Sequence, residues 1–426
     1  MSPSSKTRVA AVGMVVVLAT AAAACSSTNS TASTSGGSGG SKIPASANSD
    51  HTGITATSVH VANVNWATIF KGAGIGAEAY ADYVNSTGGV NGRKIVVDTG
   101  DDGDTGATNK QLTQNAITND FALVGSFSLQ DNFGGSLLAK NPGMPNVSVT
   151  LDSTTNKLPN TFSPVPLNDG WEEGPLQYFR HRFPHALNAG TLVGDMPSAE
   201  AAWAGEKYVL EKVGYKVIYD PTYAVTQTDF TENVIAMKNA GVNILFVDQL
   251  PVEYAPSLLK ALNQQNFHPV VVLGAATYSN DLVPNSGGAA NVDGSFLDQN
   301  YSLYLGTDAS VIPAVGTFLK WVNTASPGFK ADLFTMYGWI SAQLFAQALQ
   351  NAGSDPTRGS LLQALSKITS FDAGHMIAAT NPAAKTVGNC YLIGEVANGQ
   401  FQRLDTPTTS NNGYRCDYGY VAPPGA

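Results

Sequence analysis

The stretch GGVNGRKIVVDTGDDGDTG, Gly88 to Gly106, has a strand-like core between two glycine-rich turns and a run of acids at its end. Asn91-Gly92 is a tight-turn signal, and the apolar run that follows it, residues 94–98, predicts a strand. Acids follow where this strand ends and the next helical segment begins: Asp98, Asp101, Asp102 and Asp104. Acids at a helix start are favoured by the helix dipole and by capping, so we expect a strand-to-helix connection here.

The same acids could belong to a metal loop. A calcium loop requires D-x-[DN]-x-[DN]-G with a distal glutamate. Here Gly100 occupies a ligand position, and no glutamate occurs in the following stretch up to Glu172. We therefore expect no metal site.

The glycine-rich run KGAGIGAEAY, residues 71–80, does not predict a nucleotide cofactor. It has the spacing G-x-G-x-G rather than the dinucleotide-binding G-x-G-x-x-G, and no suitably placed acid follows a second strand. We expect these glycines to let the start of a helix pack closely near a binding cleft. We expect no cofactor.

Outward from this stretch, short β-branched runs alternate with longer helical ones. The first series has strand-like runs at 59–66, 94–101, 121–127 and 145–151, and after the Pro-rich break LPNTFSPVPLNDG (158–170) a second series has them at 189–195, 215–220, 243–250 and 269–275. Continuous apolar strands separated by helices are typical of parallel sheets covered on both faces. The two series predict an α/β protein with two doubly wound, Rossmann-like lobes.

The bulk composition agrees with two folded lobes. The chain has 426 residues, more than one core usually encloses, and only 13% of them are charged. The formal net charge is −9, and it becomes −11 without residues 1–24, which contain Lys6 and Arg8 and no acid. An acidic surface argues against nucleic acid or anionic lipid as a partner.

The N-terminus has the layout of a secretory signal. A basic start precedes an apolar run, Val9–Ala24, that is shorter than a transmembrane helix requires. Cys25 follows directly and precedes a Ser/Thr/Gly-rich stretch, which resembles a bacterial lipobox and tether, although Ala22 stands where leucine is preferred. We expect a signal peptide over 1–24, lipidation of Cys25 and a flexible tether over 25–53; ordinary secretion is the alternative.

Two further cysteines, Cys390 and Cys416, stand 26 positions apart. In an oxidising compartment such a pair predicts a disulfide, worth about 3.5 kcal/mol by loop-closure entropy. The alternative is two buried free thiols. The segment between them is poor in core residues and would gain from the link, which favours the disulfide.

Several longer segments resemble a known family. They are YADYVNSTGGVNGRKIVVDTGDDGDTGATNKQLTQNAI (80–117), FALVGSFSLQDN (121–132), GYKVIYDPTYAVTQTDFTENVIAMKNAGVNILFVDQL (214–250) and MYGWISAQLFAQALQNAGSDPTRGSLLQALSKI (336–368). In order and spacing they are similar to the type I periplasmic binding proteins of the leucine/isoleucine/valine-binding branch. The resemblance implies two α/β lobes joined by a three-strand hinge. It also implies an N-terminal lobe over 54–165 plus about 296–385, and a C-terminal lobe over 166–295 plus about 386–426.

The resemblance also implies where a ligand binds. In this family the ligand lies between the lobes, and residues just after the third and fourth strands hold it. The implied ligand-binding positions in the first lobe are Asn65, Trp66, Phe127, Ser128, Leu129, Thr150, Leu151 and Asp152. Strand ends of the second lobe add Asp195, Gln249 and Tyr278. Each of these could instead be a turn residue or a satisfied polar group of the core.

One departure bears on the ligand. Amino-acid-binding members place an acid shortly after the strand that matches VVVLGA, where this chain has Ala276 and carries Asp281 only further on. An ammonium group buried without a partner is costly. Asp152 or Asp195 could replace the acid, but we expect instead a ligand that is not a standard branched-chain amino acid: an amide, an organic acid, or an aromatic or apolar metabolite.

The sequence predicts a binding protein rather than an enzyme. No G-x-S-x-G elbow occurs, and Pro184 separates His181 from His185, which makes a zinc pair improbable. We expect a monomeric lipoprotein outside the cell membrane that delivers a small solute to an ABC transporter permease. The alternatives are a sensor subunit of a membrane signalling receptor on the same fold, and a secreted hydrolase with a Ser–His–acid cluster.

Overall fold

The computed structural model describes residues 43–167, 170–195, 197–224, 226–250, 253–405 and 410–424, all within one compact unit. The expected signal peptide (1–24), Cys25 and the tether up to residue 42 lie outside the described residues. Within the described residues, no helix has both the length and the apolar character that crossing a bilayer requires.

The first sheet has the strand order β2-β1-β3-β4. Its strands are β1 (Ser58–Asn65), β2 (Lys94–Asp101), β3 (Ala122–Val124) and β4 (Asn146–Val147). All three pairings are parallel, as the apolar runs predict. Because the order reverses direction at β1 and β3, the carboxyl ends of these two strands border the crevice at which ligands bind in open α/β sheets.

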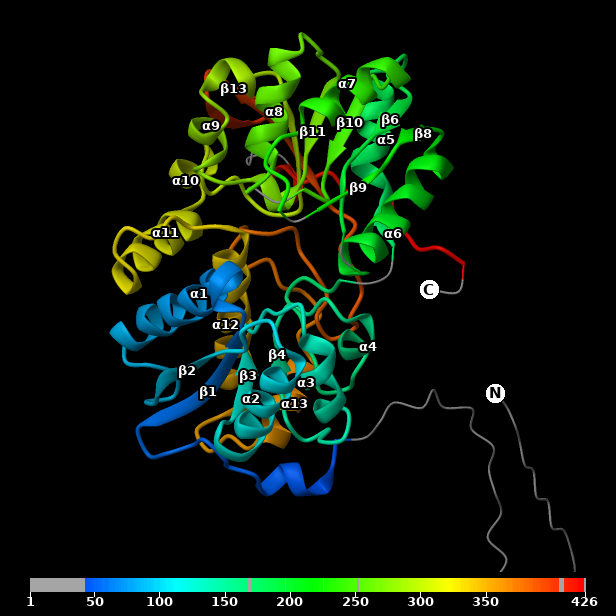
Figure 1. The fold of residues 1–426 in the computed structure, drawn as a ribbon. Coiled ribbons are helices and arrows are strands. Elements are labelled where there is room, and N and C mark those ends of the chain that lie inside the picture. Colours follow the sequence, from blue (N-terminus) through cyan, green and yellow to red (C-terminus); the bar gives the residue numbers. More distant parts are fainter. Residues whose placement is uncertain are drawn as a thin grey trace, which may run out of the picture. The chain divides into compact units, whose positions relative to one another are not determined.

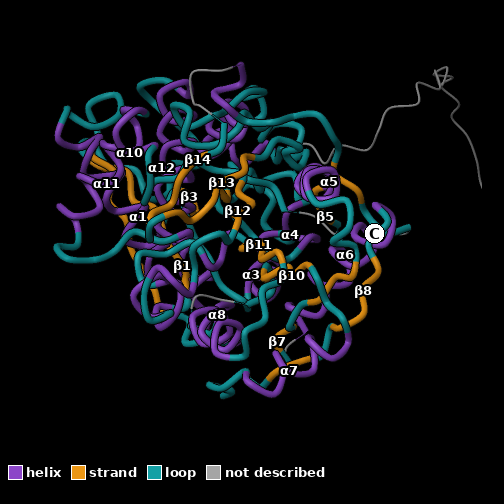
Figure 2. The backbone as a smooth tube through the Cα atoms, turned by 90° about the horizontal axis from the view of Figure 1, so that it is seen from above, coloured by secondary structure: helices purple, strands orange, loops and turns teal. Residues whose placement is uncertain are grey.

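The second sheet has the order β14-β13-β12-β11-β10-β6-β8, which can be followed in Figure 2. Its strands are β6 (Asn188–Gly190), β8 (Lys216–Tyr219), β10 (Ile244–Val247), β11 (Val270–Leu273), β12 (Phe296–Gln299), β13 (Leu392–Ala397) and β14 (Gln400–Arg403). The five neighbouring strands β8, β6, β10, β11 and β12 pair in parallel, whereas β13 and β14 are antiparallel. Two short pairs lie outside the main sheets: β5 (Trp171–Glu172) with β15 (Tyr420–Val421), and β7 (Val193–Gly194) with β9 (Thr222–Tyr223).

Helices connect the strands in both sheets. Those of the first half are α1 (Ala67–Ser86), α2 (Gly106–Asn119), α3 (Asp131–Leu138), α4 (Ser153–Asn156), α5 (Glu173–Arg182), α6 (Pro197–Val213) and α7 (Thr231–Ala240). Those of the second half are α8 (Ala255–Gln264), α9 (Leu282–Asn285), α10 (Asp308–Val311), α11 (Pro313–Ala325), α12 (Leu333–Ala352) and α13 (Arg358–Leu365). Short 3-10 turns are η1 (Ala45–Ser49), η2 (Ala275–Thr277), η3 (Ala289–Asn291) and η4 (Ser410–Gly413).

The glycine-rich run at 71–80 lies inside α1 and packs against α12, beside it in Figure 1. A Cβ atom at Gly76 would lie 2.0 Å from the Thr335 carbonyl oxygen, and one at Gly338 would lie 2.0 Å from the Ala73 carbonyl oxygen. The two helix backbones therefore meet directly, and only glycine fits at the contact. The glycines thus allow a close helix contact, whose partner is α12, while their place near a binding cleft stays a prediction.

The chain passes between the two sheets three times: after β4, after β12 and after α13. The first and third passages touch, since the Thr380 hydroxyl donates to the Pro164 carbonyl at 2.8 Å. Strand β12 belongs to the second sheet, so the second passage begins after Gln299. The lobe boundaries near residues 165, 296 and 385 remain predictions.

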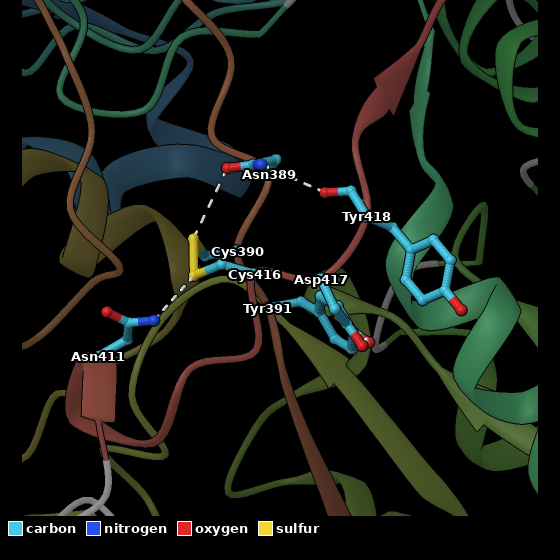
Figure 3. The surroundings of a disulfide bond; sticks show 7 residues. All are labelled: Asn389, Cys390, Tyr391, Asn411, Cys416, Asp417 and Tyr418. Carbon is cyan, nitrogen blue, oxygen red and sulfur yellow. Dashed lines mark hydrogen bonds between the residues drawn. A yellow bond between two sulfur atoms is a disulfide. The ribbon is translucent and has the colours of Figure 1, made fainter.

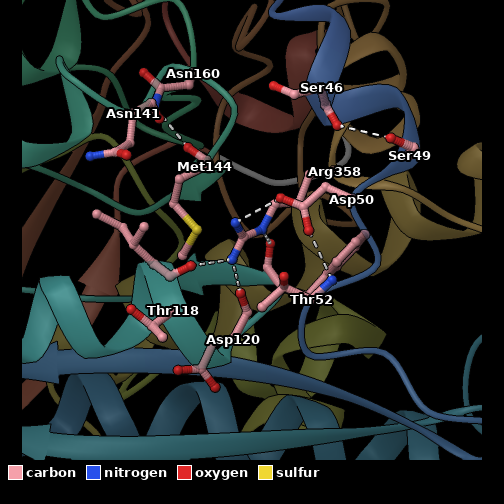
Figure 4. Close-up of polar contacts among 12 residues, drawn as sticks. Ser46, Ser49, Asp50, Thr52, Thr118, Asp120, Asn141, Met144, Asn160 and Arg358 are labelled. Atoms are coloured by element: carbon pink, nitrogen blue, oxygen red, sulfur yellow. Dashed lines mark hydrogen bonds and ion pairs between the residues drawn. The ribbon is translucent and has the colours of Figure 1, made fainter.

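A buried arginine holds the N-terminal segment against the first lobe (Figure 4). Arg358 is 5% exposed, and its Nη1 atom contacts Asp50 Oδ2 at 3.0 Å. Its Nη2 and Nε atoms donate to the carbonyls of Ile117 at 2.9 Å, Asp120, and Phe121 at 3.3 Å. Arg358 begins α13, and its guanidinium contacts the residue after η1, the end of α2 and the residue before β3. It therefore fixes the beginning of the described chain to these three elements.

Candidate functional site

Of the acids at Asp98–Asp104, Asp101 and Asp102 hold the turn and the helix starts, whereas Asp98 lies inside β2 and contacts His60 Nδ1 at 3.0 Å, so its expected place at the strand end is wrong. Asp101 Oδ1 accepts from the backbone N–H of Ala67 at 3.0 Å, at the first residue of α1, and the N-cap of α2 is Thr105. Asp102 Oδ2 accepts from the Asn109 amide at 2.9 Å and from the Ser128 hydroxyl. Among the described residues, no group of three or more His, Cys, Asp or Glu side chains is arranged to hold a metal ion.

Aromatic side chains gather at the carboxyl ends of β1 and β3. Trp66, which directly precedes α1, contacts Phe70 with ring centroids 5.8 Å apart, and Phe70 contacts Phe127 at 5.0 Å. Phe127 in turn contacts Phe334 at 5.0 Å and Tyr337 at 5.7 Å, both on α12. We call these five residues the aromatic group. Two of them, Trp66 and Phe127, are predicted site residues, and Trp66 is only partly buried.

Four carboxyl side chains meet in the second lobe. Glu172 comes from β5, Glu206 from α6, Asp248 from the end of β10 and Asp298 from β12; we call them the carboxyl cluster. Burial is the main cause that raises the pKa of each of them, and the neighbouring carboxylates add to it at Glu172, Glu206 and Asp298. The pKa of Glu172 rises to about 8 and that of Asp248 to about 7.

Hydrogen bonds hold this cluster in place. Glu206 is fully buried and accepts from the amide of Gln249, a predicted site residue, at 2.8 Å. Burial and the neighbouring carboxylate of Asp248 both raise the pKa of Glu206, and its Oε1 atom is buried without a hydrogen-bond partner among the described residues. Gly274 makes room for the pair, because a Cβ atom there would lie 2.1 Å from Asp248 Oδ1.

The aromatic group and the carboxyl cluster meet at Tyr337. Burial first, and then the charge of Glu172, raise the pKa of the Tyr337 hydroxyl. Tyr337 belongs to α12, which packs on the first sheet, whereas Glu172 belongs to the cluster at the strand ends of the second sheet. Tyr337 of the aromatic group therefore lies within electrostatic reach of Glu172 in the carboxyl cluster.

Three of the predicted residues of the first lobe, Phe127, Ser128 and Thr150, help to line a separate small cavity of about 30 Å³. The Ser128 hydroxyl donates to Asp102, while the Thr150 hydroxyl is buried and has no partner among the described residues. The cavity has room for about one water molecule, which suits the Thr150 hydroxyl.

The remaining positions of the first lobe serve its backbone. Asp152 caps α4 by accepting from the Thr155 backbone N–H at 2.8 Å. Asp131, whose pKa is raised to about 6 by burial, accepts from the Leu151 and Asp152 backbone N–H groups at 2.6 and 3.2 Å. The Leu151 side chain itself is 38% exposed.

Three further positions differ in what they can offer a ligand. Asn65 is 1% exposed and donates to the Asn63 side chain at 2.6 Å, and Leu129 is partly buried against the core. Asp195 is exposed beyond β7. The structure therefore leaves Asn65 little surface for a solute.

Tyr278 lies in the core rather than beside the carboxyl cluster. It is 1% exposed, and its hydroxyl accepts from the Leu305 backbone N–H at 2.7 Å. Its ring contacts Tyr304 at 5.0 Å and Phe401 at 4.6 Å. The short turn η2 after β11 directs the side chain inward, so Tyr278 offers a solute no surface in this conformation.

The disulfide prediction is confirmed. Cys390 and Cys416 are bonded, with Cα atoms 4.3 Å apart (Figure 3). The bridge joins the residue before Tyr391, at the entrance to β13, to the C-terminal segment that carries β15.

Comparison with known proteins now places the fold. The model of the family described as "Periplasmic binding protein" matches residues 65–400. The chain belongs to this family. It is 26% identical over 314 residues to Leu/Ile/Val-binding protein homolog 1 of Brucella suis biovar 1, an alignment that covers 68% of this chain and 80% of that protein.

Two solved structures of periplasmic binding proteins show the same fold. The fatty acid ABC transporter substrate-binding protein from Thermomonospora curvata superposes with a TM-score of 0.68 at 16% identity, covering 88% of this chain and 95% of that one. The branched-chain amino acid substrate-binding protein LivJ from Streptococcus pneumoniae, in complex with isoleucine, gives a TM-score of 0.65 at 15% identity, covering 82% and 99%. The chain is thus a type I periplasmic binding protein with two α/β lobes, as its sequence predicts.

Members of this family are extracytoplasmic binding proteins rather than enzymes; as substrate-binding proteins of ABC importers they bind small solutes and deliver them to permeases.

The carboxyl cluster is the feature of this periplasmic binding protein that the sequence did not reveal. Its four acids come from segments between Glu172 and Asp298, and none of them is among the acids that the sequence suggested for the ligand, Asp152, Asp195 and Asp281. The one available signal was Asp248 at the end of the buried run ILFV.

Proposed function

We propose that this periplasmic binding protein is a lipoprotein of an ABC importer, attached to the outer face of the membrane through Cys25. It captures one small solute between its lobes by hinge closure and presents the closed form to a permease. No chemical step is part of this cycle. The lipobox-like sequence before Cys25 supports the anchor, and the family supports the import role.

We further propose that the solute has a hydrogen-bond-donating head, an amide or an amine, on an apolar or aromatic body. The carboxyl cluster carries this proposal. Its partly ionised oxygens accept hydrogen bonds or pair with an ammonium group, whereas they repel a carboxylate. The aromatic group, which includes Tyr337, suits an apolar body.

The first lobe argues against an amino acid as the ligand. The family resemblance implies that Ser128 lies in a segment that holds the ligand, yet its hydroxyl proton is already donated to Asp102. Asp131 lines the same small cavity and adds further negative charge at pH above about 6. A ligand carboxylate would meet acids on both sides, so we propose that standard branched-chain amino acids are not the ligand.

Thermal unfolding of the chain from Ser26 onward, which lacks the lipid-bearing Cys25, tests this function. A ligand at a hundredfold excess over its Kd stabilises the folded state by about 2.7 kcal/mol. Phenylacetamide and phenethylamine should raise the unfolding temperature, whereas leucine and benzoate should leave it unchanged. A large shift with leucine or benzoate would contradict the proposed ligand class.

A matched pair of variants locates the site. Asp248→Asn should weaken binding of the amine at least tenfold, because it removes an acceptor and a charge from the cluster. Asp355→Asn is the control, since Asp355 is 86% exposed and its side chain lies only near His51. Equal affinities for the two variants would place the ligand elsewhere.

A further inference from the structure

A second cavity, of about 400 Å³, lies on the second lobe, and no member of the aromatic group or the carboxyl cluster lines it. The end of α5 lines it with Tyr178, His181 and Arg182, and the start of β13 adds Tyr391. This volume lies within the range of small-molecule sites. The cavity plays no part in the proposed solute site.

The disulfide builds the other wall of this cavity. That wall consists of Arg415, Asp417 and Tyr418, which immediately surround Cys416, while Cys390 precedes Tyr391 (Figure 3). The Tyr391 hydroxyl donates to Asp417 Oδ1 at 3.0 Å. The bridge is therefore one link between the two walls, beside the backbone hydrogen bonds between Tyr391 and Arg415 at 2.7 and 2.9 Å, and we expect its reduction to loosen the cavity.

The charges around the cavity balance. Arg415 forms two hydrogen bonds with Asp405, at 2.7 and 2.9 Å, and its guanidinium lies 4.8 Å from the ring centroid of Tyr178. Arg182 donates to the Tyr178 hydroxyl at 3.3 Å, and within the described part of the chain it has no carboxylate partner. Asp417 is exposed. The positive charges of two guanidinium groups are thus balanced by the negative charges of two carboxylates, so the cavity does not select an ion by net charge.

The cavity nevertheless offers both kinds of hydrogen-bonding group. Arg182 retains N–H donors, Asp417 retains lone pairs, and the Tyr178 and Tyr418 hydroxyls can donate or accept. Tyrosine rings also provide flat apolar surface next to these groups. A neutral ligand with several hydroxyl groups and apolar C–H faces matches this set.

We propose that this cavity binds a saccharide. Arg182 and Asp417 bond to its hydroxyl groups, tyrosine rings cover its C–H face, and the Cys390–Cys416 bridge keeps the site assembled. This second site is independent of the proposed solute site.

Calorimetric titration of the chain from Ser26 onward with N,N′-diacetylchitobiose, maltose and cellobiose tests the proposal. At least one of the three should bind, and Arg182→Ala should weaken that binding at least tenfold. Arg180→Ala is the matched control: it removes the same charge from the same helix, and Arg180 does not line the cavity. Asp248→Asn should also leave the sugar affinity unchanged.

Reduction with tris(2-carboxyethyl)phosphine supplies a second test. It should abolish sugar binding while the protein remains folded by circular dichroism, and Tyr418→Phe should weaken binding in the oxidised protein. Three outcomes would overturn the proposal. The first is that none of the three sugars binds, and the second is that Arg180→Ala and Arg182→Ala lose sugar affinity equally. The third is that benzoate binds instead of the sugars and that Arg182→Ala abolishes this benzoate binding.

Discussion

Replacing Gly76 by alanine tests the direct contact of α1 with α12. The new Cβ atom would lie 2.0 Å from the Thr335 carbonyl oxygen and 2.8 Å from the Trp339 backbone nitrogen, whereas such atoms keep at least 3.0 Å from their neighbours. Both obstacles are backbone atoms, so the helices must separate by roughly 1 Å. Overpacking of this kind costs about 1–3 kcal/mol, and we take the upper end because no side chain can move aside.

Alanine also favours the helix by about 1 kcal/mol over glycine, so Gly76→Ala should destabilise the protein by about 2 kcal/mol net. Gly316→Ala in α11 is the matched control. Gly316 is exposed, and the nearest atom to its added Cβ is 3.7 Å away, so this variant should be stabilised by up to about 1 kcal/mol. Urea unfolding measures both. The close helix contact is refuted if Gly76→Ala proves at least as stable as Gly316→Ala.

Four further predictions concern stability and attachment. Arg358→Ala should cost about 3–5 kcal/mol in urea unfolding, because it leaves Asp50 and three buried carbonyls without their donor, and near-parental stability would contradict that role. The pKa of Glu172, ordinarily 4.5, rises to about 8 on folding, so its stabilising effect is complete below pH 4.5 and is lost as the pH rises to about 8. The unfolding temperature should therefore fall across this window, and more weakly in Glu172→Gln. Cys416→Ser should lower the free energy of unfolding by about 3.5 kcal/mol and remove any effect of reductant, which unchanged stability would exclude. Cys25→Ala should release the protein from membranes into the medium, as immunoblotting of the two fractions would show; retention of the variant would argue against a lipid anchor.

Local sequence patterns predicted the parallel core well. The run at 94–101 is β2, and the runs at 243–250 and 269–275 contain β10 and β11, because continuous β-branched stretches between turn signals have few alternatives. The antiparallel strands β13 and β14 were not anticipated. The register of β13 depends on β12, almost one hundred residues earlier, and local pattern carries no information about such a partner. Strand β14 pairs with β13 across Asn398-Gly399, a tight-turn signal that the sequence does contain.

The candidate site was predicted only in part. Trp66 and Phe127 join one group because both follow strands that are neighbours in the sheet, a relation that topology alone supplies. Tyr278 follows a strand as well, but the turn after β11 directs it into the core. The carboxyl cluster could not be predicted, since its acids come from two helical or loop segments and two strands that meet only through tertiary folding.

The pairing of β15 with β5 has a practical consequence for anyone who modifies this protein. Tyr420 lies opposite Glu172 in that ladder, so a strand close to the C-terminus supports a member of the carboxyl cluster. A purification tag or fluorescent fusion at the C-terminus would directly strain the pairing of β15 with β5. The C-terminus, usually the safest point of attachment, is here the place where an added domain would disturb solute capture, and a dye attached there would report on it.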